Sequence, residues 1–394
     1  MTDPERKKRC NTAGTACGMR KEVKMIIRNG LIFRGKEGFV EDTLYIRDGL
    51  FAETAGGDVI DAGGCYVIPG LVDIHFHGAM GYDLCDGRPE AVAAIAEYEL
   101  ANGVTSICPA TMTLDKDRLT RICQSAAQYR ADAADHPAGA RLMGIHLEGP
   151  FIAPEKKGAQ NPAYIVPPSV ELLDMLLDES RGLVKLITVA PEIVPAMSFI
   201  PEAVRRGVHV SIGHTACDYD TASRAIKLGA DHLTHTCNAM PPLSHRAPGP
   251  VGAGYMAENV MAEIICDGIH VHPAMVKGLL RLYGEDRVIF ISDSMRAAGM
   301  PDGNYDLGGL NVHVSGPRAK LADGTIAGSV SNLMQCVRQA VSMGISLETA
   351  VTCATINPAR SISIHNQVGS LDIGKYADCV LLDQNTLEIR QVLR

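Results

Sequence analysis

The stretch LVDIHFHG, residues 71–78, decides how the rest of the chain is interpreted, because it combines a buried-strand pattern with two closely spaced histidines. His75 and His77 end the apolar run that follows the Gly of VIPG. Successive side chains of a strand point to opposite faces, so the two imidazoles share a face. Two neutral imidazoles side by side can bind a metal ion, but one packed and one surface histidine would give the same pattern. The remaining sequence has to separate these interpretations.

Short runs of the same kind recur along the chain from Gly70 onward. They alternate with longer amphipathic stretches, which is typical of βα units around a parallel sheet. The eight runs are LVDIHF (71–76), TSICPA (105–110), LMGIHLE (142–148), VKLITVA (184–190), HVSIGH (209–214), HLTHTC (232–237), AEIICDG (262–268) and VIFISD (288–293). Eight units predict a closed (β/α)8 TIM barrel, an α/β fold that we assign to residues 69–358.

The segments outside this region have a different pattern. Residues 23–68 and 359–394 contain short strands broken by turn signals, without long helices between them. We expect both segments to form one small β-sandwich domain built from the two chain ends. Residues 1–22 are polar and lack the apolar core of a signal peptide, so we expect a disordered extension, or a true start at Met19 or Met25.

Composition and charge exclude several classes of protein. The 394 residues are 46% hydrophobic, yet no apolar run approaches the roughly 18 residues of a membrane span, so we expect no membrane association. A net charge of −8 with mixed signs gives no footprint for nucleic acid, although a local patch could bind a phosphorylated small molecule. Most of the 12 cysteines lie in apolar segments, which favours free thiols in a reducing cytoplasm.

Polar residues gather where the predicted strands end. They are His75 and His77 on the first run, Glu148 on the third, His214 on the fifth, His235 on the sixth and Asp293 on the eighth. A TIM-barrel site is assembled at this C-terminal face. Such a set suits one or two divalent cations, zinc first, with iron, manganese or cobalt as alternatives, and a bound water that becomes nucleophilic. Hydrolysis is the predicted chemistry, with Asp293 as the general base.

Each of these residues also has a plain structural interpretation, as a buried polar group satisfied by hydrogen bonds. That interpretation is weakest for Glu148, because a carboxylate in an apolar strand needs strong compensation. We interpret His146 as a second-layer or core residue, and His209 and His232 as structural or exposed residues.

Longer motifs follow one another in order from about Met25 to the C-terminus. They are PGLVDIHFHG, GIHLEGPFI with KKGAQNP, SIGHT, THTCNAMPPLSHRAPG, DGIHVHP, SDSMRAAGMPDGNYDLGG, and NPARSISI with GSLDIGKYADCVLLD. Together they resemble the N-acetylglucosamine-6-phosphate deacetylases of the amidohydrolase superfamily. The HxH pair alone occurs throughout that superfamily, whereas HLEGPF with NAM and DGIHV is specific.

The resemblance implies an activity and a set of site residues. The activity is metal-dependent hydrolysis of the acetamide of N-acetyl-D-glucosamine 6-phosphate to D-glucosamine 6-phosphate and acetate. The implied metal ligands are Glu148, His214 and His235 for the principal ion, and His75 and His77 for a second ion bridged by Glu148, with Asp293 as the catalytic acid/base. The implied substrate contacts are Asn238, Ala239, Arg246, His270 and Gln160, of which Arg246 would reach the phosphate from a neighbouring subunit of a homodimer.

Three alternatives remain open at this point. Many relatives have KKGAHNP where this chain has Gln160, so an N-acetylgalactosamine-6-phosphate deacetylase is compatible with the sequence. A cyclic-amide hydrolase would normally bridge its metals with a carboxylated lysine on the fourth strand, and this chain offers only Lys185 at the start of that strand. A non-catalytic barrel scaffold would usually have lost metal ligands, which this chain keeps.

Overall fold

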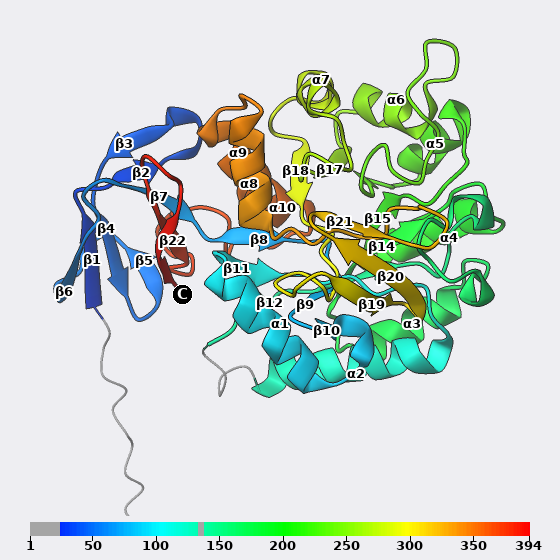
Figure 1. Cartoon of the computed structure of the whole chain (residues 1–394), viewed down its shortest axis with the longest axis horizontal. Helices are drawn as coiled ribbons and strands as arrows, with labels where there is room; N and C mark the ends of the chain where they lie inside the picture. Colours follow the sequence, from blue (N-terminus) through cyan, green and yellow to red (C-terminus); the bar gives the residue numbers. More distant parts are fainter. Residues whose placement is uncertain (1–23, 133–137) are drawn as a thin grey trace, which may run out of the picture.

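Two segments of different architecture make up the described part of the chain, which comprises residues 24–132 and 138–394 of a computed structural model. A barrel surrounded by helices forms the larger part, and two small sheets lie at one side of it (Figure 1). The extension predicted for residues 1–22 lies outside the described residues.

Eight parallel strands form the barrel, and each coincides with one of the eight predicted runs. They are β8 (Leu71–Asp73), β11 (Val104–Ile107), β13 (Ile145–Glu148), β14 (Val184–Val189), β15 (His209–Ile212), β16 (His232–Leu233), β17 (Met261–Ile265) and β18 (Val288–Ile291). Strands β13 to β18 pair in sequence order, and β8 pairs with β11, which also pairs with the short β12 (Arg141–Leu142). The predicted TIM-like barrel is therefore confirmed.

Backbone hydrogen bonds close the barrel at both junctions between these sheets. The Asp293 N–H donates to the His75 carbonyl at 2.9 Å, and the His77 N–H donates to the Ser294 carbonyl at 2.7 Å, which joins the last strand to the first. At the other junction Ala110 forms an isolated bridge with His146. The residues that follow β8 and β18 are consequently neighbours.

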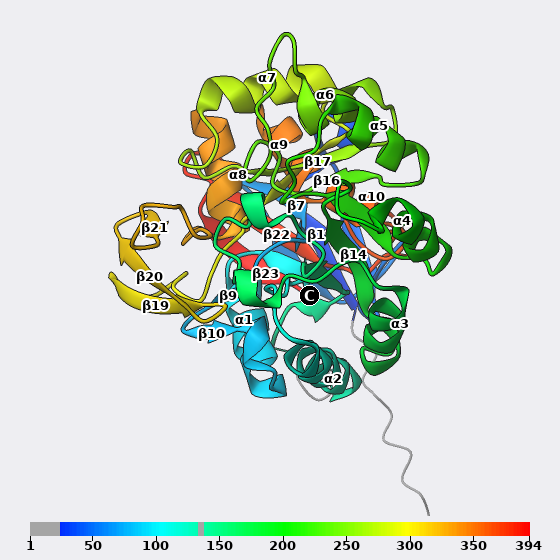
Figure 2. The ribbon, with the colours of Figure 1, turned by 90° about the vertical axis from the view of Figure 1, so that its right-hand side faces the viewer.

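Helices cover the outside of the barrel (Figure 2). They are α1 (Pro89–Ala101), α2 (Lys116–Asp132), α3 (Val170–Glu179), α4 (Ala196–Arg205), α5 (Tyr219–Lys227), α6 (Gly249–Met256), α7 (Pro273–Tyr283), α8 (Leu333–Ser342), α9 (Leu347–Ala354) and α10 (Ile356–Ser361). Several start at side-chain caps, as where Asn332 accepts a hydrogen bond from the Gln335 N–H. No helix in the described ranges is both long and apolar enough to cross a bilayer.

The two small sheets combine strands from both ends of the chain. One has the order β5-β4-β1-β6 and the other β23-β22-β7-β2-β3. Their strands are β1 (Lys24–Arg28), β2 (Leu31–Phe33), β3 (Phe39–Glu41), β4 (Leu44–Arg47), β5 (Leu50–Ala52), β6 (Asp58–Asp61), β7 (Cys65–Pro69), β22 (Cys379–Asp383) and β23 (Ile389–Leu393). Ile27, Ile46, Val67 and Leu381 belong to one apolar cluster that both sheets share.

The structure places the chain between α10 and β22 differently from the predicted boundary at residue 359. Helix α10 runs across that position, and Ala359, Ile362 and Ile364 pack with Ile74 and Leu186 of the barrel. Because these side chains fill apolar space under the barrel, residues 359–368 are part of the barrel's packing.

Gly70 forms the joint between the small sheets and the barrel, since β7 ends at Pro69 and β8 begins at Leu71. A Cβ atom at this position would lie 2.1 Å from Thr105 Oγ1. Only glycine therefore lets β8 approach β11 closely enough to pair with it.

A further small sheet follows β18 before α8. It consists of β19 (Gly303–Leu307), β20 (Leu310–Ser315) and β21 (Arg318–Lys320), and a two-stranded ribbon of β9 (Gly78–Ala79) and β10 (Tyr82–Asp83) follows β8. Both insertions start at the C-terminal ends of barrel strands, which is where a barrel enzyme elaborates its site.

At the opposite end of the barrel, Asp231 joins the two histidines that begin β15 and β16. Its carboxylate oxygens lie 2.6 Å from His209 Nδ1 and 2.8 Å from His232 Nδ1. Burial raises the pKa of Asp231, but the neighbouring imidazoles of His232 and His209 outweigh it and lower that pKa. Burial lowers the pKa of His232, and the Asp231 carboxylate outweighs it and raises that pKa.

The Asp231→Asn variant is expected to lose stability in a pH-dependent way. The lowered pKa of Asp231 stabilises the folded protein above about pH 3.9. The raised pKa of His232 stabilises the folded protein below about pH 6.5, and this contribution is lost as the pH rises through the pKa of His232 in the folded state. The loss should therefore be largest near pH 5.5, about 1.5–3 kcal/mol for charged hydrogen bonds, and smaller at pH 9. Urea unfolding of both proteins measures it, and a pH-independent difference would contradict this account.

Candidate metal centre and substrate pocket

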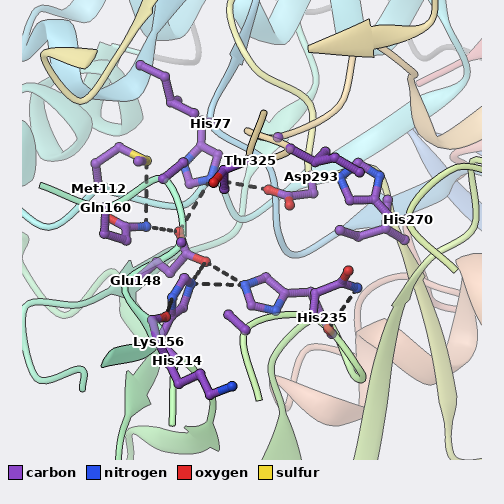
Figure 3. A pocket seen from close by; sticks show the side chains of 18 of the residues that line it. His77, Met112, Glu148, Lys156, Gln160, His214, His235, His270, Asp293 and Thr325 are labelled. Atoms are coloured by element: carbon purple, nitrogen blue, oxygen red, sulfur yellow. Dashed lines mark hydrogen bonds and ion pairs between the residues drawn. The ribbon is translucent and has the colours of Figure 1, made fainter. Parts of the chain in front are cut away.

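A cavity of about 400 Å³ opens at the C-terminal ends of the barrel strands. This is within the usual size range of small-molecule pockets. Its lining includes nine of the predicted site residues, namely His77, Glu148, Gln160, His214, His235, Asn238, Ala239, His270 and Asp293 (Figure 3). His75 lies beneath it, fully buried.

The carboxylate of Glu148 lies at the centre of the histidines, as Figure 3 shows for three of them. Its Oε1 atom is 3.1 Å from the Nε2 atoms of both His214 and His235, and 3.2 Å from His75 Nε2. Its Oε2 atom is 3.4 Å from His77 Nε2. Barrel closure therefore brings together residues that lie up to 160 positions apart in the sequence, from His75 to His235.

 

Four strand ends supply these residues, because His75 and His77 both follow β8 while the others end or follow β13, β15 and β16. The second ring nitrogens of three of the histidines are held by acceptors behind them. His75 Nδ1 lies 2.9 Å from Glu263 Oε2, His77 Nδ1 lies 3.2 Å from the Ala110 carbonyl and His214 Nδ1 lies 2.8 Å from the Lys156 carbonyl. In the neutral rings these Nδ1 atoms carry the proton, which leaves the Nε2 lone pairs facing the Glu148 carboxylate.

This arrangement fits a divalent cation. Lone pairs that face a carboxylate at 3.1–3.4 Å repel it unless a proton or a cation lies between them. Imidazole and carboxylate donors are the set that zinc takes, and donor atoms bound tetrahedrally at about 2.0–2.1 Å lie roughly 3.3–3.4 Å apart. Glu148 with His214 and His235 could hold one ion, and Glu148 with His75 and His77 a second.

Asp293 faces the second of these groups. Its Oδ1 atom is 3.2 Å from His77 Nε2 and 3.8 Å from His75 Nε2. Asp293 Oδ1 and His75 Nε2 are both buried and lack a hydrogen-bond partner within the described residues. Both atoms can donate a lone pair, so a cation bound between them would satisfy both.

Neighbouring imidazoles counteract the effect of burial on the carboxylates of the pocket. Burial raises the pKa of Glu148, but the neighbouring His75 and, when their rings carry a proton on Nε2, the hydrogen bonds from His214 and His235 outweigh it and hold that pKa well below its usual value. Burial likewise raises the pKa of Asp293, and His77 and His75 outweigh it and lower that pKa. A lowered pKa favours the unprotonated form of Asp293, which is the form that a general base requires.

Three of the strand-end residues adopt left-handed backbone conformations. The φ angles are 46° for His214, 28° for His235 and 48° for Asp293. Each such conformation costs on the order of 1–3 kcal/mol in a residue other than glycine and persists only where the surroundings fix it. The strain accompanies the turn that aims each side chain into the pocket.

The predicted substrate contacts occupy different surroundings. Asn238, Ala239 and His270 line the pocket, and His270 Nδ1 lies 2.7 Å from the Asp267 carboxylate. Gln160 is 2% exposed, and both ends of its amide are engaged. Its Nε2 donates to Glu148 Oε2 at 2.6 Å, and its Oε1 accepts from the Thr113 N–H at 2.6 Å.

Arg246 is the one predicted contact that the structure does not bring to the pocket of its own chain. It is exposed in the loop between β16 and α6 and does not belong to the cavity lining. Sequence reasoning missed several residues that do, among them Met112, Lys156, Ala159, Leu307, Thr325 and Ile326. Lys156 and Ala159 lie in the KKGAQNP motif, whereas the last three follow β18 and carry no polar pattern that would single them out.

The fold and the pocket define a barrel protein with a metal-binding site of the type that hydrolases use. The chain belongs to the amidohydrolase family, whose sequence profile matches residues 66–393. It is 34% identical to N-acetylglucosamine-6-phosphate deacetylase of Lysinibacillus sphaericus over 375 residues, which cover 93% of this chain and 95% of that protein.

Other relatives are similar to the same extent. N-acetylgalactosamine-6-phosphate deacetylase of Escherichia coli O157:H7 is 34% identical over 361 residues, 91% of this chain and 94% of that protein. Among solved structures, the N-acetyl-D-glucosamine-6-phosphate deacetylase of Mycobacterium smegmatis in complex with N-acetyl-D-glucosamine-6-phosphate superposes with a TM-score of 0.85 at 32% identity. The superposition covers 95% of this chain and 98% of that chain.

The Glu148→Gln variant is expected to lose bound zinc, because the Glu148 oxygens lie within 3.1–3.4 Å of all four histidine Nε2 atoms. Elemental analysis after dialysis against buffered zinc should show a loss of at least one equivalent per chain. His232→Asn is the matched control, since it disrupts the His209, Asp231 and His232 group at the other end of the barrel. Zinc lost from the control and kept by Glu148→Gln would put the metal at that end instead.

Proposed function

We propose that this chain hydrolyses the acetamide of N-acetyl-D-glucosamine 6-phosphate to D-glucosamine 6-phosphate and acetate. The observation that carries the proposal is the buried Glu148 carboxylate among four histidine Nε2 atoms, with Asp293 beside it in a pocket of small-molecule size. The nearly full-length similarity to deacetylases of this substrate supports the substrate class.

The donor geometry supports the proposed metal roles. Glu148, His214 and His235 would hold the principal ion, and His75 and His77 would complete a second position, with Asp293 as a further ligand. Zinc suits the nitrogen-rich donor set best. When bound, a divalent cation polarises a carbonyl group and lowers the pKa of a coordinated water towards neutrality.

Asp293 performs the proton transfers in this proposal. Its carboxylate takes a proton from the attacking water as the new C–O bond forms at the acetyl carbon, which gives a tetrahedral intermediate. It then gives that proton to the sugar nitrogen as the C–N bond breaks, so that acetate and the free amine leave. The position of Asp293 is fixed for this by the hydrogen bond from its N–H to the His75 carbonyl.

The remaining pocket residues orient the substrate. His270, held by Asp267, and the segment of Asn238 and Ala239 lie where they can contact the sugar phosphate. Gln160 would contact the sugar only by giving up a bond to Glu148 or Thr113, so its main effect is on the Glu148 carboxylate. Binding energy from the phosphate contacts places the acetamide near Asp293.

A galacto-configured substrate is the second candidate. The specific observation in its favour is that the Escherichia coli N-acetylgalactosamine-6-phosphate deacetylase is as similar to this chain, at 34% identity, as the Lysinibacillus enzyme. The two sugars differ in the orientation of one hydroxyl group, so both have to be assayed side by side.

Three structural proposals accompany the activity. The two small sheets would form one β-sandwich domain around their shared apolar cluster. The enzyme would work in the cytoplasm, where the free cysteines of the described residues, most of them buried, stay reduced. The enzyme would be a homodimer in which Arg246 of each chain binds the phosphate in the other chain's pocket, since a guanidinium donates two parallel hydrogen bonds to phosphate.

Acetate release tests the activity. The wild-type enzyme with counted zinc should release acetate from N-acetylglucosamine 6-phosphate, faster than from the galacto epimer or the unphosphorylated sugar. Asp293→Asn should lower kcat by about 10²–10⁴-fold, because the general base is lost. Asp302→Asn, an exposed position on the segment after β18, is the control and should keep the wild-type rate. Zinc-loaded protein that cleaves none of the three sugars would refute the proposal.

Mixed dimers test the Arg246 proposal. Arg246→Ala should raise KM for the phosphorylated sugar and leave KM for the unphosphorylated sugar unchanged. Subunits of Arg246→Ala mixed and reassembled with subunits of Asp293→Asn should regain activity, because the pocket with an intact Asp293 then receives an intact Arg246 from its partner. An inactive mixture that contains verified mixed dimers would show that Arg246 does not act across the interface.

A further inference from the structure

Glu263 is a buried carboxylate that the mechanism above does not use. It lies in the middle of β17 within the apolar run AEIICDG and is fully buried. Its Oε2 atom is 2.9 Å from His75 Nδ1 and accepts a second hydrogen bond from the His235 N–H at 3.3 Å. One oxygen therefore touches two of the proposed ligand residues, which come from different strands.

Within residues 24–132 and 138–394, the ion pair of Glu263 is with His75 and involves no arginine or lysine. Glu263 Oε1 is buried and lacks a hydrogen-bond partner within the described residues. The titratable side chains that interact with Glu263 include His75, His146, His232 and the Cys108 thiol. A buried carboxylate with one unsatisfied oxygen is costly, and an apolar residue of similar volume would remove that cost. A purely structural role in β17 therefore does not explain why a carboxylate is present at position 263.

The surroundings of the ligand histidines are asymmetric in charge. His77 and His214 are backed by the neutral carbonyls of Ala110 and Lys156, whereas His75 is backed by a carboxylate. A carboxylate behind a ligand histidine fixes its tautomer, makes Nε2 a stronger donor and adds negative charge near the ion. These effects are strongest at the ion position formed by His75 and His77, because Glu263 contacts His75 directly.

We propose that Glu263 is a positioning residue that acts through His75 and determines how tightly the second cation is held. The inference rests on the metal centre of the proposed function and not on the identity of the sugar. With the Glu263 charge in place the centre keeps two ions. Without that charge it keeps only the ion at Glu148, His214 and His235.

Glu263→Gln tests the proposal, because it keeps the side-chain shape and an oxygen acceptor and removes the charge. Zinc affinities are measured on metal-stripped protein by competition with a chromophoric chelator, and zinc per chain by elemental analysis. The weaker of the two zinc affinities should fall about 10–100-fold, and the tighter one should change little. Glu99→Gln is the matched control, since Glu99 is also fully buried and lies outside the pocket on α1.

A double variant separates action through His75 from a general structural effect. In a His75→Gln background, Glu263→Gln should cause no further loss of zinc affinity. The proposal is overturned if Glu263→Gln keeps both wild-type affinities, if it weakens both ions equally, or if its effect is undiminished without His75. It is also overturned if wild-type protein binds a single zinc. Since none of these measurements uses a sugar, a protein that binds two zinc ions but releases no acetate would refute the proposed activity alone.

Discussion

The structure of this barrel depends on how it accommodates buried negative charge at the ends of its strands. Glu148 and Asp293 lie in a pocket where burial alone would keep them protonated, and imidazole rings hold their pKa values below the usual range. Charged groups can be buried only where opposite charge or hydrogen bonds compensate them. The histidine rings supply that compensation when they carry a proton on Nε2, and a cation bound between the two groups would supply it when Nε2 carries a lone pair. The residues at the strand ends therefore contribute charged and hydrogen-bonding groups, and the rest of each strand contributes apolar packing.

The packing below the pocket separates this charge from the apolar parts of the barrel. Burial lowers the pKa of His146 to about 3, so the ring is neutral, and its Nε2 pairs with Thr188 Oγ1 at 2.8 Å. The hydroxyl of Thr188 pairs in turn with Thr234, and Thr234 with Ser211. Neutral hydrogen-bonded groups can be buried at much lower cost than ions. These neutral, hydrogen-bonded side chains thus lie next to the ligand residues and beside the Glu263 carboxylate.

Much of the fold could be predicted from the sequence, because each barrel strand is a short apolar run and the ligands end those runs. Contacts that form only when the barrel closes, or that involve residues behind the ligands, could not be predicted from the sequence. Nothing in KKGAQNP indicates that Gln160 uses both ends of its amide on Glu148 and Thr113. Leu307 and Ile326 reach the pocket from the segment after β18 as ordinary apolar residues. Glu263 did carry a signal, a carboxylate inside an apolar run, which is the same signal that identified Glu148.

The small sheets and the metal centre are connected by one short piece of backbone. Strand β7 of the small sheets passes through Gly70 into β8. The last residue of β8 that pairs with β11 is Asp73, and His75 and His77 follow it by two and four residues. Gly70 has no space for a side chain against Thr105, so this passage is fixed in position. Strand β7 is itself held by β2 and β22 on either side. The β-sheets at the chain ends therefore anchor the strand that carries half of the ligand histidines, which gives them a direct part in the geometry of the centre.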